Sequence, residues 1–500
     1  MTLTNEQLDI LDYVSHHLET ETPTTVAIEA VAGSGKTSTL VEIANLLDNT
    51  SHNLYLAYNK SIAVEASNKF PVNTECKTTH SLAYGPIITH GLDMDGETGS
   101  KREVTPFTFR SITENIPYEE KNLIVKMLEK FFLSSYIDIE NFLDSLTQPL
   151  EEDTENLIKQ YWRAMVYKDI AVPHPFYLKL FHILLADELI HYDPWDIVML
   201  DEAGDINPVT LEIFKLLPSQ IKVMVGDSQQ NIYSFNNTIN GFNKVNAAHF
   251  PLSQSFRCSP AIAKIVEPFC TEHLNPEMRF IGTENDGRIK STAIISRTNS
   301  GLIAYAIELT KEKIPFKLTR SPYEIFKLVL SLIALHNGKE IYESQYKYLH
   351  DDEDEYTSSD ILRRVFPSFH SFLEDKYHED KQLLAGIKLM RTHNFNDIFN
   401  AYNYAKKLAA IKTKSDLTLS TAHSSKGLTF DRVKIASDFY IGETLFKHIS
   451  AREPWEQEEL RLAYVTLTRA RVELVGHQAL LTPVEPVRDY YDPYSAQEIP

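Results

Sequence analysis

The chain has little cysteine and no long apolar run. Its three cysteines, Cys76, Cys258 and Cys270, are too few and too scattered for a disulfide framework or a paired-cysteine zinc site. The most apolar stretch, 325–336, contains Lys327 and is far shorter than the roughly 20 residues that span a bilayer. We therefore expect a protein of a reducing compartment, the cytoplasm, with no membrane partner, and we predict a core helix over 325–336.

The N-terminal segment also lacks the basic and then apolar run of a secretion signal, because it carries acidic residues there instead. It is typical of a capped amphipathic helix whose apolar side holds Leu8, Leu11, Tyr13 and Val14.

Basic residues are in deficit. Lys and Arg number 49 against 69 Asp and Glu, which gives a net charge of -20. A basic coat is thereby excluded, so a nucleic-acid partner would have to bind in a local groove. Two stretches contain no Lys or Arg at all: 131–158 has seven carboxylates and 350–362 has six. We expect both to belong to outer insertions, which would leave the rest of the chain less acidic.

The chain is long enough for several domains. Its 500 residues predict about three to four domains, and 43% hydrophobic with 24% charged residues is ordinary for a globular protein. Short apolar runs that end in Gly, Asp or Thr clusters are typical of buried parallel strands, and most precede a helical pattern. These runs are 26–31, 54–57, 197–200, 221–225, 293–295 and 417–420. They predict an α/β fold with RecA-like or Rossmann-like sheets.

The segment AVAGSGKT, Ala30–Thr37, lies between one such strand and a helical pattern. Glycine lets backbone N–H groups approach phosphate oxygens, a lysine reaches the β and γ phosphates, and a hydroxyl binds Mg²⁺. A Gly/Ser turn before a helix is the alternative, but the flanking elements favour a P-loop. The predicted nucleotide-binding residues are Ala32, Gly33, Ser34, Gly35, Lys36, Thr37 and Ser38, with Thr37 as a metal ligand.

A second carboxylate site follows another predicted strand, in WDIVMLDEAGD. Asp201 could hold Mg²⁺, and Glu202 could orient and deprotonate the attacking water. An acidic pair after a strand is usually a solvated turn, but its place after a P-loop unit favours the catalytic interpretation.

Together with later segments, these residues resemble superfamily 1 helicases of the UvrD/Rep/PcrA type, over most of the chain apart from the insertions and tail. The segments YNKSIA and THSLAYG further resemble the F-box DNA helicase branch and its viral or bacterial relatives, although no F-box is evident. The motifs occur in the family's order: Gln7 in LTNEQLDIL, AVAGSGKT, LAYNKSIAVEA, TTHSLAY, DEAGD, VGDSQQNIYSF, QSFRCS, ISRTN, STAHSSKGLTFDRV and EELRLAYVTLTRAR.

The resemblance implies roles around ATP. Gln7 would read an edge of adenine and Phe256 would stack on its face. A sensor and two arginine fingers would surround the γ phosphate, namely Gln230, Arg257 and Arg469. Gly427 also falls in a nucleotide-binding motif.

The resemblance also implies contacts to single-stranded DNA. Aromatic side chains stack on bases, a role that falls to Tyr233 and Phe235, although such a pair more often packs in a core. Residues in phosphate- or base-contacting motifs are Asn59, Lys60, Thr79, His80, His423 and Lys426.

Some positions depart from the family pattern. Gly204 stands where a Gln usually couples hydrolysis to DNA, and Thr429 stands where a Glu contacts ribose. Ser38 replaces a frequent Arg, and Asn236 and Asn237 replace Arg-Gly. We expect hydrolysis to survive these changes and coupling to be altered.

We therefore predict two RecA-like domains, 1–88 with 186–250 and 251–323 with 413–500. The stretches 89–185 and 324–412 would be mainly helical insertions. The expected activity is a DNA-stimulated ATPase, with ATP and Mg²⁺, that moves 3′ to 5′ on single-stranded DNA and acts at single/double-strand junctions, as a monomer.

Three alternatives stay open. One is a remodeller that displaces proteins such as recombinases from DNA. Another is a helicase subunit of a nuclease or defence complex, with recombination, replication or nuclease proteins as partners. The last is a nucleotide-gated switch without translocation.

Overall fold

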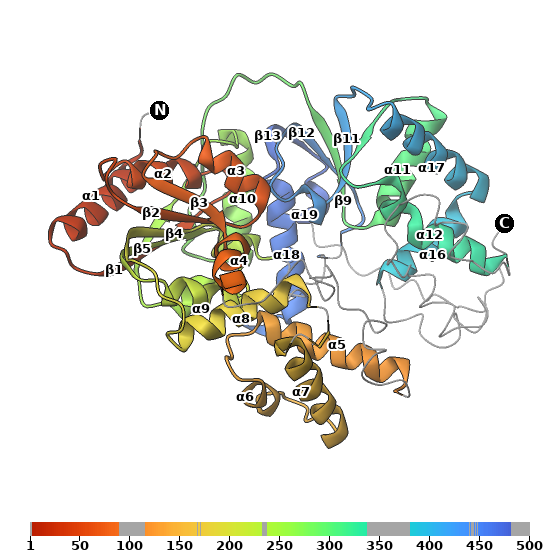
Figure 1. The fold of residues 1–500 in the computed structure, drawn as a ribbon. Helices are drawn as coiled ribbons and strands as arrows, with labels where there is room; N and C mark the ends of the chain where they lie inside the picture. The colour runs from red at the N-terminus through yellow and green to blue at the C-terminus, as the bar shows by residue number, and fades with distance from the viewer. Residues whose placement is uncertain are drawn as a thin grey trace. The chain divides into compact units, whose positions relative to one another are not determined.

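The computed structural model describes residues 3–89, 116–167, 169–170, 172–232, 238–337, 381–439, 441, 445, 447 and 449–481. The chain divides into two compact units, Met1–Gln254 and Ser255–Pro500 (Figure 1). Each unit is built on its own parallel sheet.

The first unit contains a six-stranded sheet in the order β3-β2-β4-β5-β1-β6, and all of its strand pairs are parallel. The order shows that the chain crosses over between strands, as in P-loop folds. The strands are β1 (Thr24–Ala30), β2 (Asn53–Ala57), β3 (Thr74–Thr78), β4 (Trp195–Leu200), β5 (Ser219–Gly226) and β6 (Ala248–Leu252).

Successive strand residues enter two different hydrophobic cores, because side chains alternate across a sheet. Ile28 and Val225 lie in the core with helices α1 (Asn5–Glu19), α2 (Lys36–Ala44) and α3 (Lys60–Ser67). Ala27 and Met224 lie in the other core, with α4 (Thr79–Thr89) and α9 (Pro208–Leu216). The sheet is therefore covered on both faces, which explains its continuous apolar runs.

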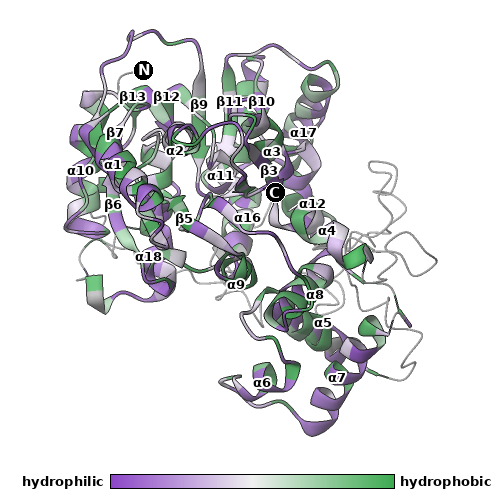
Figure 2. Cartoon of the chain, turned by 60° about the vertical axis from the view of Figure 1, so that its left-hand side comes forward, coloured by the Kyte–Doolittle hydropathy of each residue, from purple (hydrophilic) through white to green (hydrophobic). Residues whose placement is uncertain are grey.

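After α4, the helices described before β4 extend the second of these cores. They are α5 (Tyr118–Leu133), α6 (Ile139–Asp144), α7 (Glu152–Val166) and α8 (His174–Ala186). Phe131, Trp162 and Phe176 form an aromatic cluster among them. Figure 1 shows α5, α6 and α7 on one side of the first unit's sheet. The helices carry both hydrophobic and hydrophilic colouring, as amphipathic elements do (Figure 2).

The second unit has a five-stranded parallel sheet in the order β10-β11-β9-β12-β13. Its strands are β9 (Thr292–Ser296), β10 (Lys317–Leu318), β11 (Leu417–Thr421), β12 (Phe430–Ile435) and β13 (Ala470–Val475). A short two-stranded sheet pairs β7 (Gln254–Ser255) with β8 (Ile281–Gly282). Helices α11 (Asn299–Lys311), α12 (Pro322–His336), α16 (Lys381–Thr392) and α17 (Phe395–Ala410) share one core with Ile294 and Leu419. Helices α10 (Pro260–His273) and α18 (Pro454–Leu467) contact each other and β13.

The predicted parallel α/β fold is confirmed, and each of the six predicted runs corresponds to a strand. The predicted helix over 325–336 is α12, and its buried side chains are Ile325, Phe326, Val329, Leu330, Ser331, Leu332 and Ile333. Within the part of the chain described, no helix has the length and apolar character needed to cross a membrane. The three cysteines carry free thiols. The predicted stretch 350–362 lies outside the described residues.

One helix residue was predicted wrongly. Leu8 is 45% exposed, and the buried face of α1 consists of Gln7, Ile10 and Val14 instead. The strand β3 was not predicted, because its sequence TECKT is polar and only partly buried at the edge of the sheet. An edge strand buries little surface, so it needs no apolar run.

Lys179 of α8 is fully buried in the helical part of the first unit. Its Nζ donates to the backbone carbonyls of Ser134 and Tyr136, at 2.7 Å each, just after α5 ends. The same atom lies 5.0 Å from the Phe131 ring centroid. Burial lowers the pKa of Lys179 to about 7, although Glu212 opposes the shift.

We expect Lys179→Met to lower the free energy of unfolding by about 1 to 3 kcal/mol, because two buried carbonyls lose their donor. Between pH 7 and the usual lysine pKa the unfolded chain binds a proton that the folded protein does not, so wild-type stability should rise with pH in that window. The deficit of the variant should therefore grow between pH 7 and pH 9, as measured by denaturant titration.

The exposed Lys126 of α5 provides the matched control, since Lys126→Met should leave both stability and its pH dependence unchanged. A Lys179→Met protein with the same pH slope as the wild type would contradict the assignment.

Candidate nucleotide-binding site and nucleic-acid interface

The candidate phosphate loop follows the carboxyl end of β1 and leads directly into α2, which begins at Lys36. Gly33 and Gly35 have φ angles of 76° and 82°, in the left-handed region that side chains disfavour. The two glycines therefore allow a tight turn directly before the start of the helix, where an anion is stabilised.

Lys36 and Glu202 form the central ion pair of this loop. Lys36 Nζ lies 2.8 Å from Glu202 Oε1, and the side chains are 17% and 26% exposed. Burial opposes the charge of the ammonium, but Glu202, Asp201 and Asp227 outweigh burial and raise the pKa of Lys36. Glu202 has φ 56°, a conformation that costs free energy for a residue with a side chain. Such strain at a charged residue is typical of a functional position.

Asp201 lies at the end of β4 and is 7% exposed. Its Oδ1 accepts from the Glu202 backbone N–H at 2.8 Å, and its Oδ2 accepts from the Tyr55 hydroxyl at 2.7 Å. Burial and the adjacent Glu202 raise the pKa of Asp201, while Lys36 and Tyr55 act in the opposite direction. A bound cation would favour the ionised carboxylate further.

These groups fit Mg²⁺ and a polyphosphate. Ser34 Oγ, in the centre of the loop, is buried and has no hydrogen-bond partner among the described residues. Thr37 in the first turn of α2 and Asp201 supply the oxygen ligands that Mg²⁺ prefers. The ammonium group of Lys36 provides a positive charge that could bind a phosphate group.

The loop after β4 contacts the end of β5 by close backbone approach. A Cβ atom added at Gly204 would lie 2.5 Å from the Asp227 carbonyl oxygen, and one at Gly226 would lie 2.6 Å from the Gly204 nitrogen. The side chain usual in the family at position 204 therefore has no room here. Asp227 Oδ2 accepts from Gln230 Nε2 at 2.7 Å, which fixes the predicted γ-phosphate sensor.

Gln7 connects α1 to the P-loop helix. Its Oε1 accepts from the Thr4 N–H at 3.0 Å and its Nε2 donates to Thr39 Oγ1 at 2.9 Å. Gln7 is 3% exposed, so its amide is held beside α2. Its adenine contact stays a prediction.

The predicted DNA-contacting residues of the first unit follow β2 and β3. Asn59 and Lys60 are exposed at the start of α3, where Asn59 Oδ1 accepts from the Ile62 N–H. Thr79 is buried, and His80 lies edge-to-face with Tyr177. Burial and His174 lower the pKa of His80 to about 4, so the ring is neutral at pH 7. Tyr233 and Phe235 lie outside the described residues.

In the second unit the segments with the two predicted arginine fingers are bonded to each other. Arg257 Nη1 donates to the Thr468 carbonyl at 3.3 Å, and Cys258 Sγ lies 3.4 Å from the Ala470 carbonyl. Arg469 is 1% exposed and donates to the carbonyls of Val465 and Leu428. Phe256 and Arg257 are partly exposed.

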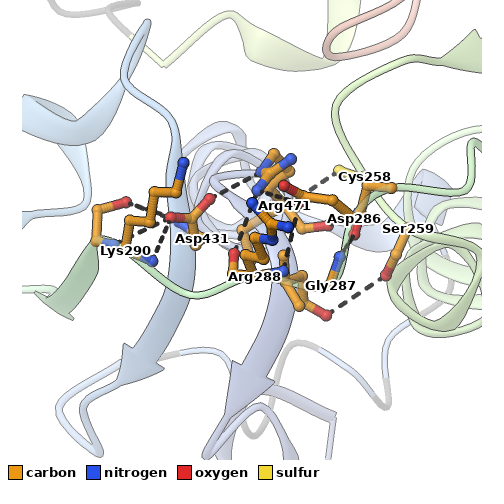
Figure 3. Close-up of polar contacts among 12 residues, drawn as sticks. Cys258, Ser259, Asp286, Gly287, Arg288, Lys290, Asp431 and Arg471 are labelled. Carbon is orange, nitrogen blue, oxygen red and sulfur yellow. Dashed lines mark hydrogen bonds and ion pairs between the residues drawn. The ribbon is translucent and has the colours of Figure 1, made fainter.

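A network of ion pairs around Arg471 stabilises the segments that carry Arg257 and Arg469 (Figure 3). Arg471 donates through Nε to Asp431 and through Nη2 to Asp286, at 2.8 Å each. The Arg471 carbonyl accepts from the Ser259 N–H and from Asn285 Nδ2. The loop before β9, strand β12 and strand β13 are thereby fixed together.

His423 and Lys426 lie in the turn between β11 and β12, with Gly427 at φ 82°. Burial and Arg297 lower the pKa of His423 to about 4, although Glu459 opposes the shift. Arg297 itself makes a two-nitrogen ion pair with Glu459 of α18. The predicted motifs after β9, after β11 and in α18 therefore meet in one cluster.

Each unit brings together its own predicted residues. Lys36, Asp201, Glu202 and Gln230 gather in the first, and Arg257 with Arg469 in the second. Tyr55 and Arg471 were not predicted from the sequence as residues that support these sites. A tyrosine within an otherwise apolar strand is the signal that could have revealed Tyr55, whereas Arg471 has no signal beyond its nearness to Arg469.

We expect Gly204→Ala to lower the free energy of unfolding by about 1 to 3 kcal/mol, because the methyl group would overlap fixed backbone atoms of Asp227 and Ser228. Denaturant titration measures the change. At Gly85 an added methyl group meets no described atom within 4 Å, so Gly85→Ala is the control and should alter stability by less than about 1 kcal/mol. Equal stability of the two variants would show that the close approach is absent.

Comparison with known proteins agrees with this arrangement. The UvrD/REP helicase N-terminal domain model matches residues 15–248, and the UvrD-like helicase C-terminal domain model matches residues 353–476. F-box DNA helicase protein 1 of Schizosaccharomyces pombe is 26% identical over 90% of this chain and 55% of its own length. F-box DNA helicase 1 of Gallus gallus is 26% identical over 96% of this chain and 49% of its own length. The chain thus spans about half the length of these relatives. With both domain models matched in order over most of its length, the chain belongs to the UvrD-like helicase family, whose domains are RecA-like.

Proposed function

We propose that the protein is an ATP-dependent DNA helicase that moves 3′ to 5′ along single-stranded DNA and opens duplex at junctions. The observation that carries the proposal is the Lys36–Glu202 ion pair beside Asp201 and the glycine-rich loop. The two relatives are both named as DNA helicases, which supports DNA as the nucleic acid.

Lys36 is held by Glu202 at the place where a phosphate group would bind. On nucleotide binding, the ammonium exchanges this carboxylate for phosphate oxygens. Glu202 is then able to orient a water molecule and accept its proton. Mg²⁺, held by Thr37 and Asp201, would neutralise phosphate charge. Gln230, fixed by Asp227, would respond to the γ phosphate.

Two arginines of the second unit would stabilise the negative charge of the γ phosphate in the transition state. Arg257 is partly exposed, and its Nη1 donates to the Thr468 carbonyl at 3.3 Å. Arg469 donates its hydrogen bonds to groups within its own unit. A phosphate contact by either arginine therefore requires these bonds to rearrange.

For DNA, we assign backbone contacts to the exposed Asn59 and Lys60 and to the turn with Lys426. His80 and His423 are neutral at pH 7, so they would contribute hydrogen bonds or ring contacts rather than charge. Bases would stack on Tyr233 and Phe235.

Replacing Lys36 with Ala, or Glu202 with Gln, should reduce ATP turnover in the presence of DNA by at least about 100-fold, because the first removes the phosphate charge and the second the general base. Phosphate release measures the rate. Lys69→Ala removes a surface lysine that pairs with Glu65 and should keep the wild-type rate. Turnover that persists in both site variants would place hydrolysis elsewhere.

Duplexes with a single-stranded tail test the direction of movement. A substrate with only a 3′ tail should be unwound in the presence of ATP, and a substrate with only a 5′ tail should stay intact, as strand separation on gels reports. Unwinding from the 5′ tail alone would reverse the polarity. ATP turnover without unwinding of either substrate would favour a protein-displacing remodeller.

A further inference from the structure

The hydroxyl of Tyr55 contacts Asp201, the candidate metal ligand, from the neighbouring strand β2. It is the third residue of β2, which pairs with β4, and Tyr55 is opposite Met199 in the register. Asp201 follows two residues after Met199, so the Tyr55 and Asp201 side chains emerge on the same face of the sheet. The Tyr55 hydroxyl reaches Asp201 Oδ2 at 2.7 Å.

The two hydrogen bonds fix the orientation of the Asp201 carboxylate. Tyr55 binds Oδ2 and the Glu202 N–H binds Oδ1, so rotation about the last side-chain bond would break both. Each carboxylate oxygen has about two acceptor sites, and one donor on each leaves the others for a cation or its water ligands.

The phenol is itself held rigidly. Tyr55 is 0% exposed, and its ring lies 4.7 Å from the Phe70 ring, centroid to centroid. It belongs to the hydrophobic core beneath α2 and α3. Asp201 Oδ2 accepts the hydroxyl's hydrogen bond at the rim of this core. A buried polar tip in an apolar core is costly unless it has a partner, and Asp201 is that partner.

We propose that Tyr55 is a positioning residue for metal binding, which holds Asp201 in the orientation that receives Mg²⁺. The inference rests on the proposed function, because it assumes that Asp201 binds the metal of a nucleotide complex. Groups that orient a metal ligand typically change metal affinity by about 10-fold to 100-fold when they are removed. A tyrosine with a purely structural role would affect stability without affecting the metal.

Tyr55→Phe removes only the hydroxyl group. With a fluorescent ATP analogue, nucleotide binding is titrated against Mg²⁺, and the Mg²⁺ concentration at half-saturation is measured. We expect that concentration to rise about 10-fold to 100-fold in the variant, while binding of the analogue without Mg²⁺ stays the same. Tyr13→Phe is the control, since it removes a hydroxyl of α1 that contacts Thr24 of β1 and should leave the Mg²⁺ dependence unchanged.

Asp201→Asn provides a second comparison. In that background Tyr55→Phe should change the Mg²⁺ dependence no further, because the hydroxyl acts through the Asp201 carboxylate. Equal Mg²⁺ dependence in the wild type and in the folded Tyr55→Phe variant would overturn the inference. A wild-type protein whose nucleotide binding ignores Mg²⁺ would instead contradict the proposed function.

Discussion

The partly buried ammonium group of Lys36 faces the carboxylates of Glu202 and Asp201 at the carboxyl edge of the first sheet, and the rest of the site depends on that arrangement. Lys36, Glu202 and Asp201 come from segments more than 160 residues apart, yet Lys36 Nζ and Glu202 Oε1 lie 2.8 Å apart. Removing charges from water is costly unless they are paired. The sheet order places β4 and β1 on either side of β5, so both loops emerge at the same edge. The lysine therefore pairs with a carboxylate here, and a magnesium–phosphate complex could replace that pairing with one between the lysine and phosphate and one between a carboxylate and Mg²⁺.

The positions of the strands follow from the sequence, because buried parallel strands need continuous apolar runs such as VAIEAV and IVML. The P-loop and the acidic pair are likewise local patterns whose chemistry depends on neighbours in the chain. Tyr55 and Arg471 act through residues 146 and 40 positions away, and no local pattern reports such contacts. The predicted burial of Leu8 was wrong for a related reason, since the face of α1 that is buried depends on where the sheet lies.

Gly204 illustrates what the structure adds to a departure from a family pattern. The sequence shows only that a side chain is missing. The structure shows that Asp227 and Ser228 occupy its space, so the loops after β4 and β5 are in direct backbone contact. Strand β2 connects the candidate metal site to the candidate DNA contacts along the chain. It holds Tyr55 against Asp201, and the chain then continues into Asn59 and Lys60.

Above all, we expect nucleic acid to control hydrolysis at the Lys36–Glu202 site. The most direct measurement is the steady-state rate of ATP hydrolysis by the wild-type protein, with Mg²⁺, in the absence and presence of saturating single-stranded DNA. We expect a rate at least about tenfold higher with DNA, which corresponds to about 1.4 kcal/mol in the activation free energy. The same rate under both conditions would contradict it.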